Sequence, residues 1–266
     1  MDIQELKKKA AQLRIDTLRM INKSGSGHTG GSMSIMDIIT ALYYGPGASD
    51  DDYVVLSKGH GVPAQYAALI DKGVIDKDEE NHLRQVGSLL QGHPSIKTPG
   101  ITISSGSLGQ GFSSAHGLAM GLKLDKKPNQ VFAILGDGEL QEGIIWEVAM
   151  SAGHFRTDNL VAIVDNNKLQ IDGTVREVMN VEPIQSKFES FGWKVIQVTD
   201  GHSMEEVVEA IEKARKFDRQ PVCLWCHTVK GQGVPFAENK ASYHGVALSD
   251  EELVEAEKVI NDSVAN

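Results

Sequence analysis

The chain has 266 residues, of which 41% are hydrophobic and 23% are charged, and its formal net charge at pH 7 is −10. A chain of this size can bury the core of one large α/β domain or of two small ones, and its negative charge disfavours nucleic acid, whose phosphates bind basic surfaces. No apolar run reaches the ~18 residues that cross a bilayer, and the charged N-terminus does not have the pattern of a secretion signal, so we expect no membrane partner.

The first part of the chain predicts two helices separated by a glycine-rich segment. Residues 2–23 carry an apolar stripe at helical spacing, and a second helix is expected over 35–43. Between them, residues 27–32 are so rich in glycine that no regular structure is expected. His28 in this segment is well placed to meet an anion or a sugar hydroxyl, although a plain loop histidine would have the same pattern.

Two further histidines lie in loops. Residues 52–56 predict a strand that ends in a glycine turn carrying His60, and a helix is expected over 63–72. The acidic segment 76–85 predicts a solvated helix without chemistry, and His93 follows in a Gly-His-Pro turn. Both histidines therefore lie beside backbone that glycine or proline shapes into a turn.

A second glycine-rich loop covers residues 106–111, which read GSLGQG, and a helix is expected over 113–122. Its spacing differs from the G-x-G-x-x-G of dinucleotide-binding loops, so we expect neither a nicotinamide nor a flavin cofactor. Glycines let a backbone approach a flat ring closely, and Leu108 offers an apolar contact to such a ring.

The interpretation depends most on a βαβ unit over residues 131–167. A short apolar run ends in Gly136-Asp137-Gly138, a helix with one apolar side follows, and a second apolar run ends in Asp165-Asn166-Asn167. Ligands of open parallel sheets bind beyond the carboxyl ends of the strands. We therefore expect the side chains of Asp137 and Asn167 to converge at that edge.

Oxygen atoms at this edge suit a magnesium ion that holds a diphosphate. Mg²⁺ takes about six oxygen ligands and commonly keeps phosphate oxygens among them. Gly136 and Gly138 lack Cβ atoms, so a diphosphate can approach the backbone, and the N–H groups that open the next helix favour its charge. A Gly-Asp-Gly tripeptide alone is more often a simple turn, and it is the order strand, turn, helix, strand, Asn that favours the metal site.

The rest of the chain continues the alternation of expected strands and helices. Helices are expected over 184–191 and 203–217, strands over 193–198 and 221–228, and a final helix over 249–261. Taken with the earlier elements, they predict an α/β fold, a mostly parallel sheet with helices on both faces.

The end of the chain contributes a long loop and the two cysteines. Residues 229–247 lack periodicity, carry His244 and have a length that is usually functional. Cys223 and Cys226 fall in an expected strand, where residues three apart point to opposite faces, whereas redox CxxC pairs usually open a helix. We expect buried structural thiols in a reducing compartment, the cytoplasm.

Taken together, the motifs resemble transketolase. The runs SGHTG, LSKGHG, QGHP, GSLGQG, GDGELQEGIIWE, DNNKLQIDG, FGW, DGH and YHGVAL follow the order seen in that family, over nearly the whole sequence. The resemblance implies the thiamine-diphosphate-binding (PP-domain) fold, as one domain over residues 1–266 with the loop 229–247 and the helix 249–261 as its extension. Full-length transketolases are more than twice as long, and this chain lacks the domains that carry the cofactor-activating glutamate and the arginines for the sugar phosphate.

We therefore expect the N-terminal subunit of a split transketolase, a complete small gene product rather than a truncated piece. By the resemblance, the chain binds the diphosphate end of thiamine diphosphate and acts on sugar phosphates, transferring a two-carbon ketol unit. A C-terminal subunit with the pyrimidine-binding and C-terminal domains would be its partner. The chain would also self-associate, giving an assembly of two of each chain.

The resemblance also assigns site residues. The ligands of Mg²⁺, for which Ca²⁺ or Mn²⁺ could substitute, would be Asp137, Asn167 and the main-chain oxygen of Leu169. The residues around the cofactor would be His60, Gly106, Leu108, Gly136, Asp137, Gly138, Glu139, Asn167, Ile171 and His244. The imidazoles at the reacting centre would be those of His28, His60, His93 and His244.

Two acidic residues have a separate implied role. Glu142 and Glu147 would form a hydrogen-bonded network at the interface between two copies of this chain, although an isolated pair on a helix is usually two exposed charges.

Two alternative functions of the chain stay open at this point. One is a subunit of another thiamine-diphosphate enzyme, of the 2-oxoacid dehydrogenase α or deoxyxylulose-phosphate synthase type, and the other is a non-catalytic cofactor-binding module.

Overall fold

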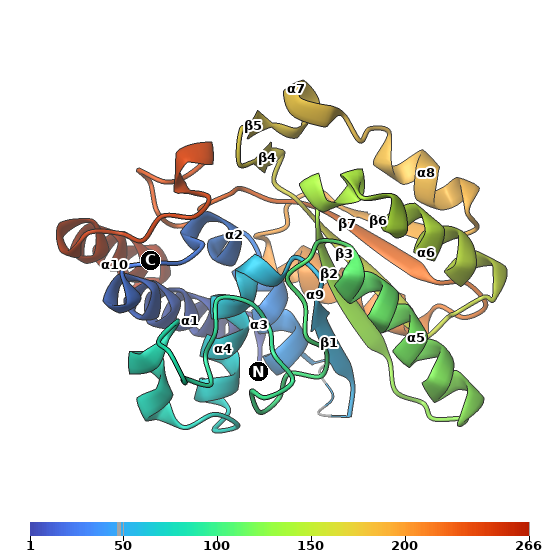
Figure 1. Ribbon diagram of the computed structural model, residues 1–266, viewed down its shortest axis with the longest axis horizontal. Helices are drawn as coiled ribbons and strands as arrows, with labels where there is room; N and C mark the ends of the chain where they lie inside the picture. Colours follow the sequence, from blue (N-terminus) through green and yellow to red (C-terminus); the bar gives the residue numbers. More distant parts are fainter. Residues whose placement is uncertain (47–48, 50, 266) are drawn as a thin grey trace.

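Five parallel strands form the central sheet, in the order β1-β2-β3-β7-β6 (Figure 1). The computed structural model describes residues 1–46, 49 and 51–265. The strands are β1 (Tyr53–Leu56), β2 (Val131–Gly136), β3 (Leu160–Asn166), β6 (Lys194–Val198) and β7 (Val222–His227). Gly136 pairs with Asp165, so β2 and β3 end in register and the residues that follow them start from one edge.

Helices cover both faces of this sheet. Those on one side are α1 (Ile3–Ser24), α3 (Met36–Tyr44), α4 (Val62–Asp71), α9 (Met204–Lys216) and α10 (Asp250–Ala265). Those on the other are α5 (Gln110–Leu124), α6 (Gly143–His154) and α8 (Ile184–Ser190). Figure 1 shows the two layers on either side of the strands. The predicted architecture, a mostly parallel sheet between two helical layers, is confirmed.

Strand β2 shows why the sequence folds this way. Its side chains alternate between the two faces: Val131 and Leu135 enter the core under α5 and α6, while Phe132 and Ile134 enter the core under α1, α3 and α4. All its residues are buried, as expected of a strand that is apolar on both sides. Cys223 and Cys226 on β7 obey the same alternation. Both are buried, free thiols on opposite faces, as predicted.

Some local predictions were wrong. The glycine-rich segment 27–32 contains a short helix, α2 (Thr29–Met33), whose residues are all buried, so packing outweighs the low helix propensity of glycine. The acidic segment forms only a 3₁₀-helix, Lys77–His82, which buries none of its residues and so has no apolar face to stabilise an α-helix. Helix α10 continues beyond the predicted end to Ala265.

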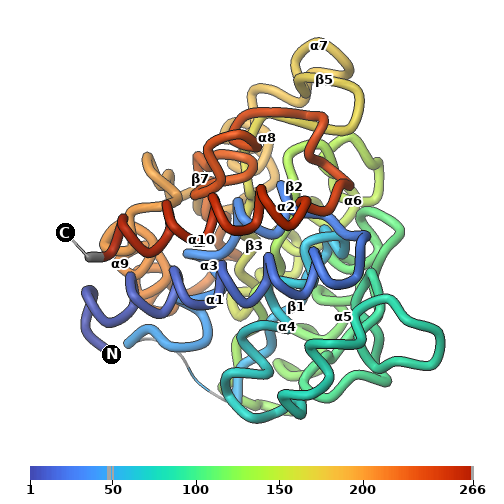
Figure 2. The backbone as a smooth tube through the Cα atoms, turned by 90° about the vertical axis from the view of Figure 1, so that its left-hand side faces the viewer, coloured from blue at the N-terminus to red at the C-terminus, as the bar shows by residue number. Residues whose placement is uncertain are grey.

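A small hairpin and helix were also not predicted. Strands β4 (Leu169–Gln170) and β5 (Gly173–Thr174) pair antiparallel and lead into α7 (Val175–Met179). Both Figure 1 and Figure 2 show this unit standing away from the body of the protein, above the edge where the sheet strands end. Its strands are only two residues long, which is too short for a sequence pattern to indicate.

The first and last helices lie side by side (Figure 2). Ala256 and Ile260 of α10 join the core on which α1 packs. The Arg19 guanidinium lies 2.7 Å from the Glu257 carboxylate, and the Asn22 amide donates to the main-chain oxygen of Leu248 at 3.0 Å. The C-terminal segment therefore completes one helical layer. Among the described residues, no helix is both long enough and apolar enough to cross a bilayer.

Two helical glycines allow a test of this packing with one type of substitution. A Cβ on Gly153 would lie 1.8 Å from the main-chain oxygen of Phe191, whereas a Cβ on Gly117 would meet nothing within 4 Å. We expect Gly153→Ala to lower the free energy of unfolding by about 1–3 kcal/mol through overpacking. Gly117→Ala should raise it by ~0.5–1 kcal/mol through helix propensity. Urea unfolding of both variants checks this, and equal effects would contradict the packing at Gly153.

Candidate functional site

Polar side chains gather where the parallel strands end. Lys58 follows β1, Asp137 follows β2, Asn167 follows β3 and Thr228 follows β7, and all four are buried. In a parallel sheet these carboxyl ends lie along one edge, where ligands of such sheets bind. The site is therefore built from residues that are far apart in the sequence and are brought together by the strand order.

A buried ion pair lies beneath this edge. The Lys58 ammonium, 1% exposed, contacts the Asp165 carboxylate at 2.5 Å and also donates to the main-chain oxygen of Gly31 at 2.9 Å. Asp165 accepts further hydrogen bonds from the hydroxyls of Ser34 and Thr228. Burial alone would raise the pKa of Asp165, but the Lys58 ammonium and these hydroxyls hold it below its ordinary value. Asp165 thus stays ionised.

Asp137 has the opposite character. Its carboxylate is 2% exposed and accepts from the main-chain N–H of Gly138 at 2.8 Å and from that of Lys168. With its amide oriented to satisfy its neighbours, Asn166 adds a third donor at 3.1 Å. Burial and the neighbouring Asp165 carboxylate still raise the pKa of Asp137 to about 7. A buried carboxylate with a raised pKa and only neutral donors is a good ligand for a cation.

The predicted partners of Asp137 lie in the adjoining loop. Lys168, whose main-chain N–H donates to Asp137, separates Asn167 from Leu169, so this loop contacts the Asp137 carboxylate. That Asn167 and Leu169 join Asp137 as metal ligands stays a prediction. The amide oxygen of Asn167 accepts from the main-chain N–H of Leu169 at 3.1 Å. The main-chain oxygen of Leu169 accepts from the buried Lys230 ammonium at 3.3 Å. Three oxygen atoms of different types are thus held in one short segment and the turn beside it.

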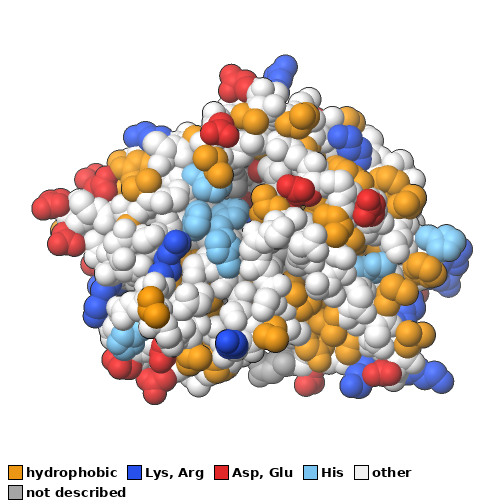
Figure 3. All heavy atoms as spheres, viewed as in Figure 1, with side chains coloured by type: hydrophobic (Ala, Val, Ile, Leu, Met, Phe, Trp, Pro, Cys, Tyr) orange, Lys and Arg blue, Asp and Glu red, His pale blue; other side chains and the backbone are white. Residues whose placement is uncertain are grey.

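The four loop histidines meet at this site. The ring centroid of His28 lies 5.3 Å from that of His60, 6.0 Å from that of His93 and 5.6 Å from that of His244, and the rings of His60 and His244 are 5.0 Å apart. Figure 3 shows histidine side chains gathered in one group at the middle of this face. The fold therefore brings together histidines from four separate motifs, and their role at a reacting centre stays a prediction.

Burial and neighbouring cations keep these imidazoles neutral. Burial, with contributions from His93, Arg84 and the lysines, lowers the pKa of His28 to about 4. Burial and Lys230 lower the pKa of His244 to about 3. The pKa values of His60 and His93 are also lowered, chiefly by burial. Neutral imidazoles can each accept a proton or a hydrogen bond at one nitrogen and donate at the other.

Two of these rings show different contacts with the surrounding chain: His60 is packed closely against α2, and His28 has a ring nitrogen without a hydrogen-bond partner. A Cβ on Gly31 would lie 2.9 Å from the His60 ring, so only glycine lets α2 approach this imidazole. In contrast, Nδ1 of His28 is buried and has no hydrogen-bond partner within the described chain. A buried polar atom without a partner is costly, and a ligand hydroxyl would supply one.

The buried Glu139 carboxylate links three segments of the site. Its carboxylate accepts from the hydroxyl of Ser57 at 2.5 Å and from the main-chain N–H groups of Gly109 and Gly136 at 2.7 and 3.0 Å. It therefore ties the ends of β1 and β2 to the GSLGQG loop. In that loop, a Cβ on Gly106 would lie 3.3 Å from the His93 ring, and the neighbouring Leu108 is half-buried.

The remaining predicted residues lie at the surface. Ile171 is 69% exposed at the turn of the β4–β5 hairpin. Glu142 is the N-cap residue of α6, Glu147 lies one turn further, and both are exposed. No hydrogen bond joins the two glutamates within the described chain. Their predicted network stays a prediction that concerns a second copy of the chain.

Sequence reasoning missed three charged residues of the site: Lys58, Asp165 and Lys230. Burial and the Lys58 charge lower the pKa of Lys230 to about 8, and its ammonium lies 2.8 Å from Nδ1 of His244. Lysines next to glycine in loops are usually solvated, so the sequence contains no sign that these two are 1% exposed. Across the described residues, no group of three or more His, Cys, Asp or Glu is arranged to hold a metal.

The Lys58–Asp165 pair leads to a prediction on stability. Lys58→Met leaves the Asp165 carboxylate buried without its countercharge and should destabilise the chain by about 3–5 kcal/mol. Adding Asp165→Asn removes that charge, so the double variant should lose less than the sum of the two single losses. Urea unfolding of the four proteins gives the coupling free energy, and strictly additive losses would show that the pair is not coupled.

Known proteins resemble this chain over nearly its whole length. Residues 6–261 match the family described as transketolase, thiamine diphosphate binding domain. The chain is 43% identical over 256 residues to 6-deoxy-6-sulfo-D-fructose transketolase subunit SqwG of Clostridium sp. (strain MSTE9), covering 93% of each chain. It is 36% identical over 272 residues to one of the subunits of apulose-4-phosphate transketolase from Phocaeicola vulgatus, covering 99% of this chain and 96% of that one.

A solved structure of a transketolase has the same fold as this chain. The crystal structure of transketolase from Campylobacter jejuni matches with a TM-score of 0.91 and 32% sequence identity. The match covers 98% of this chain but only 43% of that one, so the chain spans less than half of that transketolase. The chain therefore belongs to the transketolase family and corresponds to its N-terminal, thiamine diphosphate-binding domain.

Proposed function

We propose that this chain is the N-terminal subunit of a two-chain transketolase, which transfers a two-carbon ketol unit between a ketose and an aldose that carry an anionic group. The observation that carries the proposal is the juxtaposition, at one sheet edge, of four neutral imidazoles with the oxygen atoms around Asp137. The names of the two subunit relatives, which refer to a sulfonated and a phosphorylated ketose, support this substrate class.

The residues present fit a magnesium ion. Asp137, the amide oxygen of Asn167 and the main-chain oxygen of Leu169 are hard oxygen ligands, and phosphate and water oxygens would complete the usual six. The raised pKa of Asp137 supports the fit, because a cation would relieve the repulsion from Asp165. The Lys230 ammonium already lies against the oxygen of Leu169, which supports a cation-attracting role for that oxygen. Ca²⁺ and Mn²⁺ favour similar ligands and are proposed substitutes.

The cofactor's diphosphate would lie beside this ion. Gly136 and Gly138 would present backbone without a Cβ to it, His60 and His244 would contact it, and the buried Lys58 and Lys230 ammonium groups would balance its charge. We propose further contacts from Gly106, Leu108 and Ile171 to the cofactor. Glu139 would act through the loops that it joins, because its oxygens already accept three hydrogen bonds.

When bound, thiamine diphosphate supplies the carbanion chemistry of ketol transfer. The chain's own imidazoles would bind and orient the sugar. His28, with its unpartnered Nδ1, and His93, the most exposed of the four, would hold hydroxyls of the ketose. His60 and His244 would hold or move a proton at the hydroxyl and carbonyl oxygens of the reacting carbons. Because all four rings are neutral, each has one nitrogen that can accept a hydrogen bond and one that can donate, which suits binding of sugar hydroxyls.

The partner would be a chain with the pyrimidine-binding and C-terminal domains. Two relatives that match over nearly their whole length are named as subunits, and this chain covers less than half of the Campylobacter enzyme. Several apolar side chains are exposed on α6, at its end and on the neighbouring hairpin unit, which supports burial against other chains. They are Met150, Phe155, Ile171, Val178 and Met179.

We also propose self-association across α6, with Glu142 and Glu147 at the interface, so that two copies of each chain assemble. Residues 1–266 would act as one domain, extended by the loop 229–247 and the last helix. The family match disfavours an enzyme of the 2-oxoacid dehydrogenase or deoxyxylulose-phosphate synthase type. The four converging imidazoles, which cofactor binding alone does not need, disfavour a non-catalytic module.

Metal binding should change the ionisation of Asp137. With no cation nearby, burial raises the pKa of this carboxyl to about 7, so it is largely protonated below that pH. A bound cation favours the charged form, and Mg²⁺ with thiamine diphosphate should therefore lower the pKa by several units. Carbon-13 NMR titration of aspartate-labelled chain, with the unlabelled partner present, measures this, and Asp137→Asn assigns the signal. A titration near pH 4 before addition, or no change afterwards, would contradict the metal site.

The activity is tested by reconstitution. The chain alone should not turn over ketoses, whereas its mixture with the partner subunit, Mg²⁺ and thiamine diphosphate should convert xylulose 5-phosphate and ribose 5-phosphate into a seven-carbon ketose and a three-carbon aldose. 6-Deoxy-6-sulfo-D-fructose and apulose 4-phosphate should be compared as donors. His28→Ala should lower turnover ~100-fold or more, because the ketose would lose a hydroxyl contact that orients it at the reacting centre. Turnover by the lone chain, or use of pyruvate instead of a ketose, would refute the proposal.

A further inference from the structure

The Asp200-Gly201-His202 turn between β6 and α9 has no part in the site described above, yet it is tied closely to the neighbouring strand. The carboxylate of Asp200 accepts from the main-chain N–H of His202 at 2.9 Å. The N–H of Gly201 donates to the main-chain oxygen of His227, at the end of β7, at 2.7 Å. A Cβ on Gly201 would lie 2.5 Å from the side chain of Thr228, so only glycine lets the turn come this close to β7.

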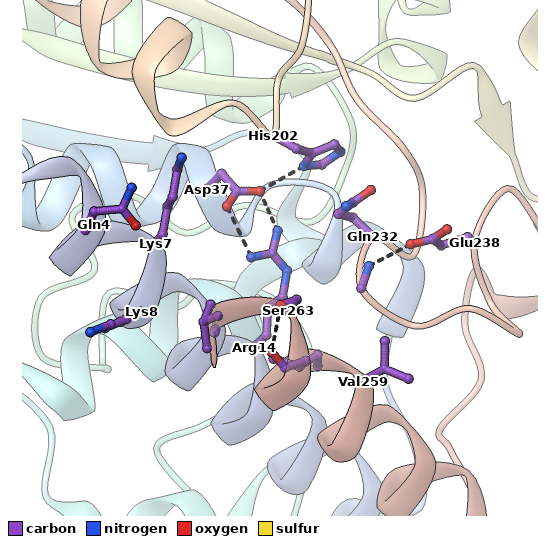
Figure 4. A pocket seen from close by; sticks show the side chains of 14 residues that line it. Gln4, Lys7, Lys8, Arg14, Asp37, His202, Gln232, Glu238, Val259 and Ser263 are labelled. Carbon is purple, nitrogen blue, oxygen red and sulfur yellow. Dashed lines mark hydrogen bonds and ion pairs between the residues drawn. The ribbon is translucent and has the colours of Figure 1, made fainter. Parts of the chain in front are cut away.

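His202 joins a buried ion pair on one side. Nδ1 of its ring lies 2.8 Å from the carboxylate of Asp37, which also binds the guanidinium of Arg14 (Figure 4). Arg14 and Asp37 are both buried, at the floor of a cavity of about 390 Å³ between α1, α10 and the loop 231–238. Burial alone would raise the pKa of Asp37, but Arg14 and His202 hold it at about 2. The carboxylate is therefore a permanent acceptor.

The other ring nitrogen holds the main chain. Nε2 of His202 lies 2.8 Å from the main-chain nitrogen of Val229, which can only donate. Nε2 must then be the acceptor and Nδ1 must carry the proton that is donated to Asp37. The two contacts fix one neutral tautomer and hold the ring between α3 and the segment that follows β7.

Val229 stands between two residues of the site. On one side, Thr228 donates its hydroxyl to Asp165. On the other, the Lys230 ammonium contacts Nδ1 of His244 and the main-chain oxygen of Leu169. The orientation of the Val229 peptide therefore sets the direction in which both neighbouring side chains leave the backbone.

We propose that His202 is a positioning residue, which fixes the Val229 peptide and thereby the Thr228 hydroxyl and the Lys230 ammonium at the end of the site that takes the metal and the diphosphate. It touches neither the imidazole cluster nor the proposed metal ligands, and it acts through the main chain. The proposal rests on the proposed function for its consequence, but the hydrogen bond and its effect on the backbone can be tested without it.

Two amide substitutions separate the two contacts of the ring. The nitrogen of an asparagine amide lies as many bonds from Cβ as Nδ1, so His202→Asn keeps the donor to Asp37 and loses the acceptor for Val229. The oxygen of a glutamine amide corresponds to Nε2, so His202→Gln keeps the acceptor for Val229 and loses the donor to Asp37. The adjacent cavity gives water access to either shortened side chain, which limits the risk of misfolding.

Hydrogen exchange of the unliganded chain is the first measurement. Peptides that cover residues 228–231 should exchange about tenfold faster in His202→Asn than in the wild type, the effect of losing about one buried hydrogen bond. In His202→Gln they should exchange at nearly the wild-type rate. His82→Asn, at a distant surface histidine, serves as the control. Unchanged exchange in His202→Asn, or equal acceleration in both variants, would overturn the proposal.

Cofactor affinity of the assembled two-chain complex is the second measurement. The half-saturating concentration of thiamine diphosphate with Mg²⁺ should rise about tenfold in His202→Asn and little in His202→Gln. A merely structural histidine would instead give losses that follow the midpoints of unfolding, and His202→Gln, which weakens the Asp37 network, should be the less stable variant. Matching ranks of stability and affinity would refute a positioning role. A wild-type complex without ketol transfer would refute the proposed function but leave the exchange result standing.

Discussion

The buried contact between Lys58 and Asp165 is the interaction on which the site depends. It joins the segment after β1 to the end of β3, and through the partners of both residues it also reaches α2 and the residue after β7. Two charges removed from water are tolerated only when each is fully paired and hydrogen-bonded. Here the carboxylate has a cation and the donors of Ser34, Thr228 and Asn167. The network fixes where four elements meet.

This pair also sets the electrostatics of the edge. Asp165 is ionised because Lys58 is beside it, and the ionised Asp165 in turn raises the pKa of Asp137. Lys58 acts in the other direction on the imidazoles, where it adds to burial in lowering the pKa of His60. The edge therefore combines one carboxyl poised for a cation with neutral rings and buried ammonium groups that favour an anion. A metal bound to a diphosphate satisfies both tendencies at once, which a bare anion or a bare cation would not.

Features that depend on sequence patterns and on the order of the strands could be predicted, whereas features that depend on individual tertiary contacts could not. The contact of Asp137 with the loop after β3 was predictable because both follow buried strands one βαβ repeat apart, and parallel strands end at one edge. The helix α2 was not predictable, because its formation depends on the close approach of Gly31 to the His60 ring, a tertiary contact that helix propensity does not contain. The burial of Lys58 and Lys230 was not predictable, because the sequence around a lysine beside a loop glycine looks the same whether its ammonium is solvated or buried against a partner. The histidines were found as loop residues, but their meeting came from family resemblance, not from spacing.

The loop 229–247 shows why a functional segment can lack any periodic pattern. It is held by single, directed contacts rather than by a repeating ladder: the N–H of Gly231 donates to the main-chain oxygen of Gly30, and the hydroxyl of Tyr243 donates to Glu252 on α10. Such contacts can aim two side chains, Lys230 and His244, at each other across the loop. A helix or strand would space its side chains by its own period and could not place both at one point. The loop therefore lacks a periodic sequence pattern because its side chains are positioned by individual contacts and not by a regular backbone repeat.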